Sequence, residues 1–170
     1  MLRWLGAALV VICSSLLSMN EVLRSRQRIR ALRVLSESMQ AMRLEVEERH
    51  TTLPELLEKL AARQKQPAAE LFSAAAINLN RRELPFSAAW EMALRETESL
   101  CLLPEERQLM ESLGRQLGRS GAGEQSAVIL RTEKKLGLFL ELEEKERLKR
   151  SRLRAAAGAG AGLMLAILLL

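Results

Sequence analysis

A chain of 170 residues is long enough for one compact domain, and its 3% of aromatic residues, lack of tyrosine and abundance of alanine, leucine, glutamate and arginine predict helices. The two cysteines, Cys13 and Cys101, and the single His50 are too few and too scattered for a disulfide framework or a metal cluster. The net charge of +5 comes from two basic segments beside apolar chain ends, which favours a membrane surface over nucleic acid as the partner.

The chain opens with a predicted membrane anchor at residues 1–20. Residues 4–19 carry no charged side chain, and as a helix they would be about 24 Å long, slightly short of a bilayer core. Flanking arginines can recover the difference, because their long side chains reach the interface. The next segment, 21–33, holds five arginines and one glutamate, which opposes export and favours an uncleaved anchor over a secretory signal peptide.

The central segment, residues 21–154, is predicted to form an antiparallel bundle of about six helices. The first starts at Glu21 and ends at Arg49, with no proline or glycine between them, and it can continue directly from the anchor. Its apolar residues recur every three or four positions, so they share one face of a helix. That face consists of Ile29, Leu32, Leu35, Met39, Met42 and Val46.

The second helix is predicted to start with a capping box. Thr52 and Glu55 have the spacing at which an N-cap hydroxyl and a carboxylate three residues later each accept a backbone N–H. Pro54 falls in the first turn, where its missing N–H leaves no hydrogen bond unmade. The apolar side of this helix consists of Leu53, Leu56, Leu57 and Leu60.

Three further helices are predicted between residues 67 and 117. Pro67, Ser87 and Pro104 mark their starts, because proline is tolerated in a first turn and serine caps one. No pattern alternates with the period of a strand over a useful length, so the fold class is all-α. The aromatic residues of these helices are interpreted as core residues rather than as a ligand-binding cluster: Phe72, Phe86 and Trp90.

Four of the nine glycines fall within residues 113–125. A phosphate-binding P-loop needs four residues between two glycines and a lysine after the second. Here Gly114 and Gly118 enclose three residues, and Arg119 follows. The chain also lacks aspartate altogether, so it has no Walker B aspartate. The cluster is therefore interpreted as a turn that reverses the chain, and nucleotide binding is not expected.

Each glycine of this turn has a predicted structural role. Gly114 lets a neighbouring helix approach closely, and Gly118 is expected to end the fifth helix with a positive φ. Gly121 and Gly123 belong to a short flexible connection. Glu124 then places a negative charge at the start of the sixth helix, where the helix dipole favours it.

The sixth helix is predicted to run from residue 124 into a second membrane anchor at 155–170, which carries no charge. Gly158 and Gly162 are four positions apart, the spacing that allows close helix packing within membranes. Basic residues flank both anchors on the side of the central domain. By the positive-inside rule, that domain is cytoplasmic and both chain ends reach the far side.

No group of residues combines a catalytic nucleophile with a base and an orienting partner, so the protein is predicted not to be an enzyme, with no catalytic, cofactor or metal site. A cytoplasmic partner must approach the end of the bundle away from the membrane, and a polar, salt-sensitive contact surface is predicted there. The alternative is that these residues are merely solvated charges at helix ends. They are Glu47, Glu48, Arg115, Arg119 and Glu124.

Three stretches of the chain resemble the stage III sporulation protein AB family. They are HTTLPELLEKLA at 50–61, PFSAAWEMAL at 85–94 and LMESLGRQLGRSGAGEQ at 109–125. The resemblance extends over essentially the whole chain, including both predicted anchors. Its most specific part is the run Leu113–Ser120 with Gln125. Many members of the family have an acidic residue after this serine, where this chain has Gly121.

The resemblance implies a domain similar to the cytoplasmic helical domains of type II secretion F proteins and pilus-assembly platform proteins. It implies a non-catalytic membrane platform that couples a separate cytoplasmic secretion-type ATPase to the channel complex of endospore formation, in the mother-cell membrane. The implied partners are that ATPase, other channel membrane proteins and the lipid bilayer, with no nucleic acid, and an oligomer is possible. The alternative is a membrane-anchored coiled-coil regulator or signalling scaffold, which would form a long parallel dimer without a bundle.

Overall fold

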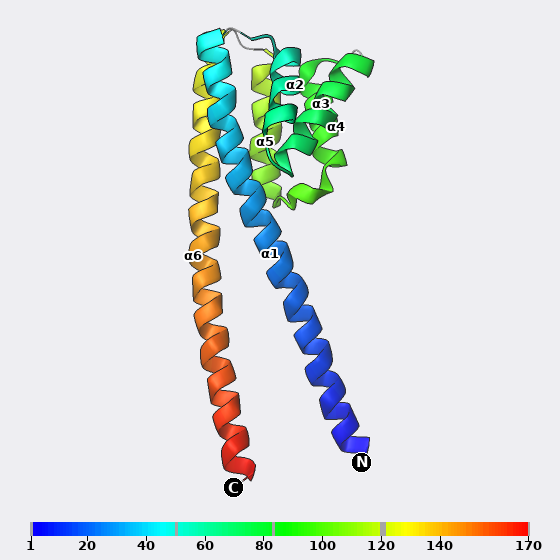
Figure 1. Cartoon of the computed structure of the whole chain (residues 1–170), viewed down its shortest axis with the longest axis vertical. Helices are drawn as coiled ribbons and strands as arrows, with labels where there is room; N and C mark the ends of the chain where they lie inside the picture. The colour runs from blue at the N-terminus through cyan, green and yellow to red at the C-terminus, as the bar shows by residue number, and fades with distance from the viewer. Residues whose placement is uncertain (1, 50, 83, 120–121, 170) are drawn as a thin grey trace.

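A computed structural model gives the structure of this chain (Figure 1). It describes the backbone of residues 2–49, 51–82, 84–119 and 122–169, and the side chains of 23–48, 51–80, 84–119, 123–151 and 153. Within these residues every regular element is a helix. The prediction of an all-α bundle with six α-helices is therefore confirmed for the described part of the chain.

The described residues form six α-helices and one short 3-10 helix, and two of the α-helices are much longer than the others. In chain order they are α1 (Leu2–Arg49), α2 (Leu53–Arg63), α3 (Ala68–Arg82), α4 (Phe86–Glu96), η1 (Glu98–Leu100), α5 (Pro104–Leu117) and α6 (Ala122–Leu169). Each α-helix packs against the next one along the chain, and α6 returns to pack along α1. The two long helices run antiparallel, so both termini lie at the same end, away from the short helices (Figure 1).

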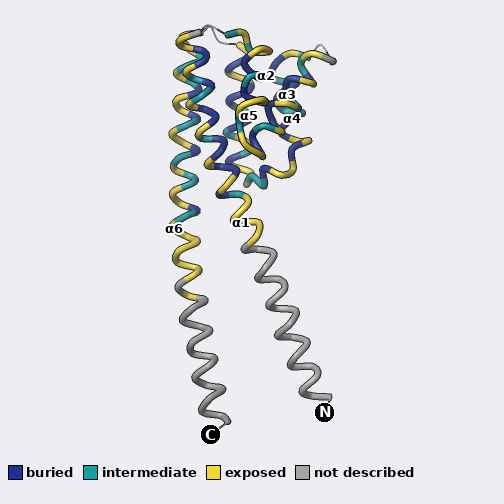
Figure 2. The backbone as a smooth tube through the Cα atoms, viewed as in Figure 1, coloured by how far each residue is buried: buried dark blue, intermediate teal, exposed yellow. Residues whose placement is uncertain are grey.

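The apolar face predicted for α1 forms the centre of the core. All six of its residues are buried, with at most 6% of their surface exposed. They are buried because α1 packs against α6 and also against the short helices. From α6, Ile129 and Leu136 are buried in the same core, and Phe139 and Leu140 pack against it. Figure 2 shows the buried positions gathered between the long helices and the short ones.

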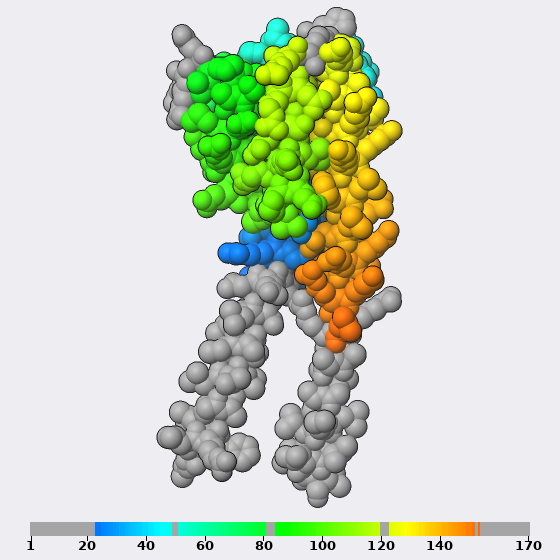
Figure 3. Space-filling view, turned by 180° about the vertical axis from the view of Figure 1, so that it is seen from behind, coloured from blue at the N-terminus to red at the C-terminus, as the bar shows by residue number. Residues whose placement is uncertain are grey.

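An aromatic cluster holds the short helices together. Trp90 on α4 stacks on Phe86, with their ring centroids 6.0 Å apart, and Phe72 on α3 packs against the same indole at 6.0 Å. The indole N–H donates a 2.8 Å hydrogen bond to the carbonyl oxygen of Met110 on α5. The three aromatic residues are therefore core residues, as predicted. Figure 3 shows α5 beside the first half of α6 on the face opposite the view of Figure 1.

The start of α2 differs in part from the prediction. Thr52 occupies the N-cap and Pro54 lies in the first turn, as expected. The Thr52 side chain, however, makes no capping hydrogen bond, so the predicted capping box with Glu55 is wrong. The Glu55 carboxylate is instead engaged by Lys59 one turn later, at 2.9 Å.

The start of α4 also differs. The helix begins at Phe86 with Pro85 at its N-cap, so Ser87 lies inside the first turn and does not cap it. Phe86 is buried in the core. The packing of Phe86 in the core explains why α4 begins one residue before Ser87, whose hydroxyl could have capped the helix.

Gly114 has the role that was predicted for it. A Cβ atom at this position would lie 2.7 Å from Cγ of Trp90 and still closer to Cδ1. Both distances are well below ordinary contact, so glycine is what lets α5 approach the indole face of α4.

The predicted positive φ at Gly118 is wrong. This residue follows α5 with φ −71° and ψ −12°, a right-handed conformation that any residue can adopt. Its N–H still bonds to the Gly114 carbonyl oxygen at 3.2 Å, so the chain continues the helical path for one more residue. A Cβ atom here would meet its neighbours at 3.5 Å, an ordinary contact.

The connection to α6 is shorter than predicted. Gly123 lies in the first turn of α6, which begins at Ala122, and is not part of a flexible connection. Glu124 lies in that same turn, as expected. Gly121 lies outside the described residues.

The two predicted anchors, 1–20 and 155–170, lie outside the residues whose side chains the structure describes, and so do Gly158 and Gly162. Among the residues that are described, none of the helices offers an apolar stretch sufficient to cross a bilayer. The domain boundaries at residues 21 and 154 stay predictions.

Candidate functional site

The predicted partner surface lies at the end of the bundle opposite the termini, where α1 ends and α6 begins (Figure 1). Glu47 and Glu48 are exposed near the end of α1, and Glu124 is exposed in the first turn of α6. Arg115 is exposed in the last turn of α5, and Arg119 is exposed just after that helix. The fold thus brings the five residues to one end of the molecule, and their role in binding stays a prediction.

Arg115 is engaged on a different side from the other four residues. Its Nη1 donates to Glu91 on α4 at 3.2 Å, and a carboxylate oxygen of Glu111 lies 4.0 Å away. The guanidinium is therefore turned toward α4 rather than toward the end of α1.

Glu47 connects α1 to α6 at this end. Its carboxylate accepts a hydrogen bond from the Ser126 hydroxyl of α6 and pairs with Arg43 at 3.1 Å. The hydrogen bond from Ser126 is the largest cause that holds the pKa of Glu47 below its ordinary value. Desolvation opposes this effect, and the charge of Arg43 adds to it.

A buried ionic cluster joins α1, α5 and α6 at the other end of the domain, and it was not predicted from the sequence. Arg28 on α1 binds Glu106 on α5, with Nη2 2.6 Å from Oε1 and Nε 3.2 Å from Oε2. Its Nη1 donates to Glu143 on α6 at 2.7 Å. Ser25 donates to the other oxygen of Glu143 at 3.0 Å, and the Leu103 N–H donates to Glu106 at 2.8 Å.

In this cluster one guanidinium group pairs with two carboxylates in a largely buried environment. The side chains of Glu106 and Glu143 are 1% and 8% exposed, and that of Arg28 is 16% exposed. Burial acts to lower the pKa of Arg28, but the hydrogen bond and charge of Glu106, followed by the charges of Glu143 and Glu146, outweigh it and raise the pKa. The guanidinium therefore stays charged and fixes three helices to one another.

The sequence did contain a signal for this cluster. Arg28 stands four residues before the buried Leu32, so it occupies the next position of the apolar face of α1. Glu106 likewise stands four residues before a buried methionine of α5, and Glu143 stands seven residues after a buried leucine of α6. Each charge thus continues the buried stripe of its own helix at the same end of the bundle.

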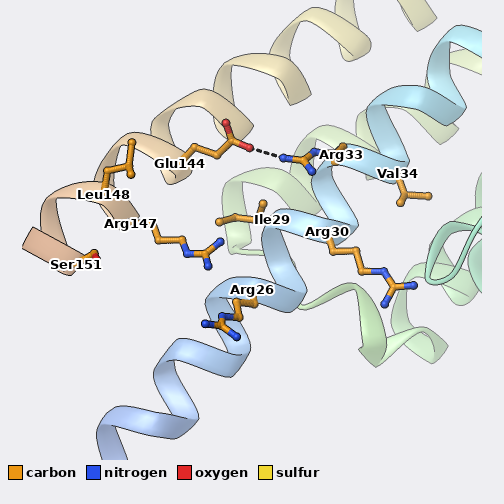
Figure 4. A pocket seen from close by; sticks show the side chains of 9 residues that line it. All are labelled: Arg26, Ile29, Arg30, Arg33, Val34, Glu144, Arg147, Leu148 and Ser151. Atoms are coloured by element: carbon orange, nitrogen blue, oxygen red, sulfur yellow. Dashed lines mark hydrogen bonds and ion pairs between the residues drawn. The ribbon is translucent and has the colours of Figure 1, made fainter.

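A basic groove runs between α1 and α6 at the level of this cluster (Figure 4). Its volume is about 580 Å³, and we call it the arginine groove. Across it, Arg33 pairs with Glu144 at 2.7 Å. The groove is lined by Arg26, Ile29, Arg30, Arg33 and Val34 of α1 and by Glu144, Arg147, Leu148 and Ser151 of α6.

The charge balance of the arginine groove favours anions. Four arginines and one glutamate line it, and the carboxylate of that glutamate is already paired with Arg33. Within the described part of the chain, no carboxylate pairs with Arg26, Arg30 or Arg147. Guanidinium groups match the planar, multiple acceptors of phosphate and carboxylate groups. No three metal-ligating side chains come together among the described residues.

The chain is similar to proteins of one family. The model of the stage III sporulation protein AB family matches residues 3–170. Stage III sporulation protein AB of Bacillus subtilis strain 168 is 28% identical over 119 residues, which are 69% of this chain and 70% of that protein. A solved structure of a stage III sporulation protein AB is 25% identical, has a TM-score of 0.66, and covers 72% of this chain and 98% of its own.

Proposed function

Because the chain belongs to the stage III sporulation protein AB family, we propose that it is a non-catalytic membrane platform of a sporulation complex. In this proposal the far ends of α1 and α6 anchor the protein in the mother-cell membrane. The short helices form a cytoplasmic domain, and the end of the bundle away from the membrane receives a separate secretion-type ATPase.

The observation that carries this proposal is the geometry of the two long helices. Each has 48 residues, and a helix of that length extends for about 72 Å. The short helices occupy only one end of this pair (Figure 1). The charge-free runs 4–19 and 155–170 belong to the other end. Such an arrangement supports a domain carried on two membrane helices.

The use of the apolar face of α1 supports a platform over a coiled-coil regulator. A long parallel dimer would need this face to pair with a second copy of α1. Here the face is buried against α6 and the short helices of the same chain. The compact bundle therefore favours the platform.

The two native cysteines provide a test of the proposed topology. Cys101 is partly exposed in the segment between η1 and α5, and Cys13 lies in the predicted anchor. In intact protoplasts, a membrane-impermeant maleimide should label Cys101 of a Cys13→Ser variant only after permeabilisation. A Leu2→Cys variant that lacks both native cysteines should be labelled without it.

The opposite pattern would contradict the proposal. Labelling of Cys101 from outside would place the domain on the wrong side of the membrane. A full-length chain that does not float with lipid vesicles would contradict the anchors themselves.

A further inference from the structure

We propose that the arginine groove binds the phosphate of an anionic phospholipid, so that a lipid headgroup sits between α1 and α6 where they leave the domain. This inference rests on the proposed membrane anchoring and goes beyond it. The anchors need only an apolar bilayer, whereas the groove selects a class of lipid.

The first argument is the supply of unpaired positive charge. Arg26 and Arg30 on α1 and Arg147 on α6 line the same groove and are exposed. Figure 4 shows the side chain of Arg147 extending from α6 toward α1, and Arg26 on the turn of α1 that precedes Arg30. A phosphate between the helices can therefore accept hydrogen bonds from both sides.

The second argument is the height of the groove above the predicted anchors. Arg26 lies six residues beyond residue 20, and Ser151 and Arg147 lie four and eight residues before residue 155. At the rise of an α-helix these offsets are about 6–12 Å. The headgroup layer occupies roughly the first 5–8 Å beyond the hydrocarbon core, and arginine side chains reach several ångströms further. This end of the groove therefore lies within reach of lipid phosphates.

The third argument is the apolar lining beside the charges. Leu148 lines the groove with 62% of its surface exposed, and Leu153, closer to the predicted membrane, is 70% exposed. A free phosphate ion has no apolar part that could cover such side chains. The glycerol and the first methylenes of a phospholipid would cover them, which favours a lipid as the occupant.

The experiment is a lipid titration of the full-length chain in detergent, followed by native mass spectrometry. Phosphatidylglycerol is the probe, and zwitterionic phosphatidylcholine, glycerol phosphate, inorganic phosphate and a glutamate-rich peptide are the comparison ligands. The test variant is Arg26→Gln/Arg147→Gln. The matched control is Arg24→Gln/Arg150→Gln, which removes the same charge from the same two turns of helix but outside the groove.

We expect phosphatidylglycerol to bind more tightly than phosphatidylcholine. We also expect the test variant to weaken its binding by about tenfold or more, since each basic residue near an anionic headgroup contributes roughly fivefold. The control variant should lose less than about threefold. Because all four arginines are exposed, far-UV circular dichroism should show folded variants. The single changes Arg26→Gln and Arg147→Gln repeat the test if the double variant is unfolded.

Three results would overturn the inference. Equal losses in the two double variants would mean that only diffuse surface charge attracts the lipid. Inorganic phosphate that competes as well as the lipid would assign the groove to a free anion. Glutamate-rich peptides that bind through the same arginines without any lipid preference would assign it to a protein partner. In each case flotation on phosphatidylcholine vesicles would still report the membrane anchors, so failure of the two proposals can be told apart.

Discussion

At the scale of single residues, two glycines four positions apart differ in how they would tolerate a methyl group. Gly114 faces the indole of Trp90, which occupies the space of a Cβ atom. Gly118 has room for one and a backbone conformation open to any residue. The first glycine is thus required by packing, and the second is not required by conformation.

We expect Gly114→Ala to lower the free energy of unfolding by about 1–3 kcal/mol, because the added methyl group overpacks the core around Trp90. This loss should appear although alanine favours a helix by about 1 kcal/mol over glycine. Gly118→Ala should cost little, and Gly137→Ala, with no atom within 4 Å of the added group, should stabilise α6 slightly. Urea denaturation of the full-length chain, followed by circular dichroism, measures all three. Equal midpoints for Gly114→Ala and Gly118→Ala would show that α5 can move away from the indole.

Removal of Arg28 should strongly destabilise the fold. Arg28→Met leaves the buried Glu106 and Glu143 without their counter-charge, and we expect a loss of about 3–5 kcal/mol. Arg33→Met is the matched control, because its pair with Glu144 is exposed on both sides and should contribute at most about 1 kcal/mol. Denaturant titration of both variants measures the two losses. Equal losses in the free energy of unfolding would mean that the buried cluster stabilises the fold no more than the exposed ion pair does.

The pH dependence of the same variant gives an independent check. The pKa of Arg28 is raised in the folded state, so its stabilising contribution is lost only as pH rises through that pKa, far above any working pH. The intact cluster should therefore hold the arginine charge constant between about pH 5 and 9. In Arg28→Met, acidification should restore part of the lost stability, because protonation removes the unpaired buried charge. If acidification lowers the denaturation midpoint of Arg28→Met as much as that of the unmodified chain, this account is wrong.

At the scale of elements, the pair of long helices is fastened by different contacts at its two levels. At the end of the domain nearer the chain termini, the buried Arg28 cluster joins α1 to α6. At the distal end the contact is the exposed hydrogen bond between Ser126 and Glu47. The carboxylate of this second contact is exposed to solvent, so mild acid can protonate it and weaken the contact.

Because the pKa of Glu47 is lowered in the folded state, the stability it contributes is present above its unfolded pKa and is lost as pH falls through the folded value. We expect the melting temperature of the unmodified chain to fall between pH 7 and pH 3 more than that of Glu47→Gln. The neighbouring exposed Glu48→Gln serves as the control and should keep the dependence of the unmodified chain. Identical pH profiles for all three proteins would exclude Glu47 as a source of this dependence.

At the scale of the whole molecule, the distal end is the part of the proposed platform most accessible from the cytoplasm. It combines the charged ends of α1 and α5 with the start of α6 (Figure 1). Arg119 and Glu124 are exposed there, and Arg115 is exposed on the α4 side. Exposed charges of this kind suit the reversible, salt-sensitive contact that we propose for a cytoplasmic partner.

We expect the double change Arg115→Glu/Arg119→Glu to reduce recruitment of the proposed ATPase partner by about tenfold or more, because it reverses the charge of the proposed contact surface. Lys134→Glu/Lys135→Glu, a reversal of equal size along α6, should leave recruitment unchanged. Co-purification from membranes measures the effect, and an unchanged helical spectrum excludes unfolding. Since Arg115 also pairs with Glu91, the single change Arg119→Glu tests the surface without disturbing α4. Normal recruitment by both variants would remove the distal surface from the proposal.

The sequence by itself determined the helices, the buried face of α1, the aromatic residues of the core and the need for a small residue at Gly114. These features depend on the spacing of apolar residues within one helix, and that spacing is fixed by the helical repeat. The family could also be identified from local motifs in the same stretches.

Only the tertiary structure decided the rest, because those features depend on groups distant in the chain. The position of Arg28 on the apolar face of α1 can be read from the sequence, but its partners cannot, because α5 and α6 bring Glu106 and Glu143 to it from 78 and 115 residues away. The arginine groove likewise requires α1 and α6 to lie side by side. The predicted capping box at Thr52 and the predicted positive φ at Gly118 are wrong for the same reason. The conformation at a helix end is set by the packing of the helices it connects, and no local pattern records that packing.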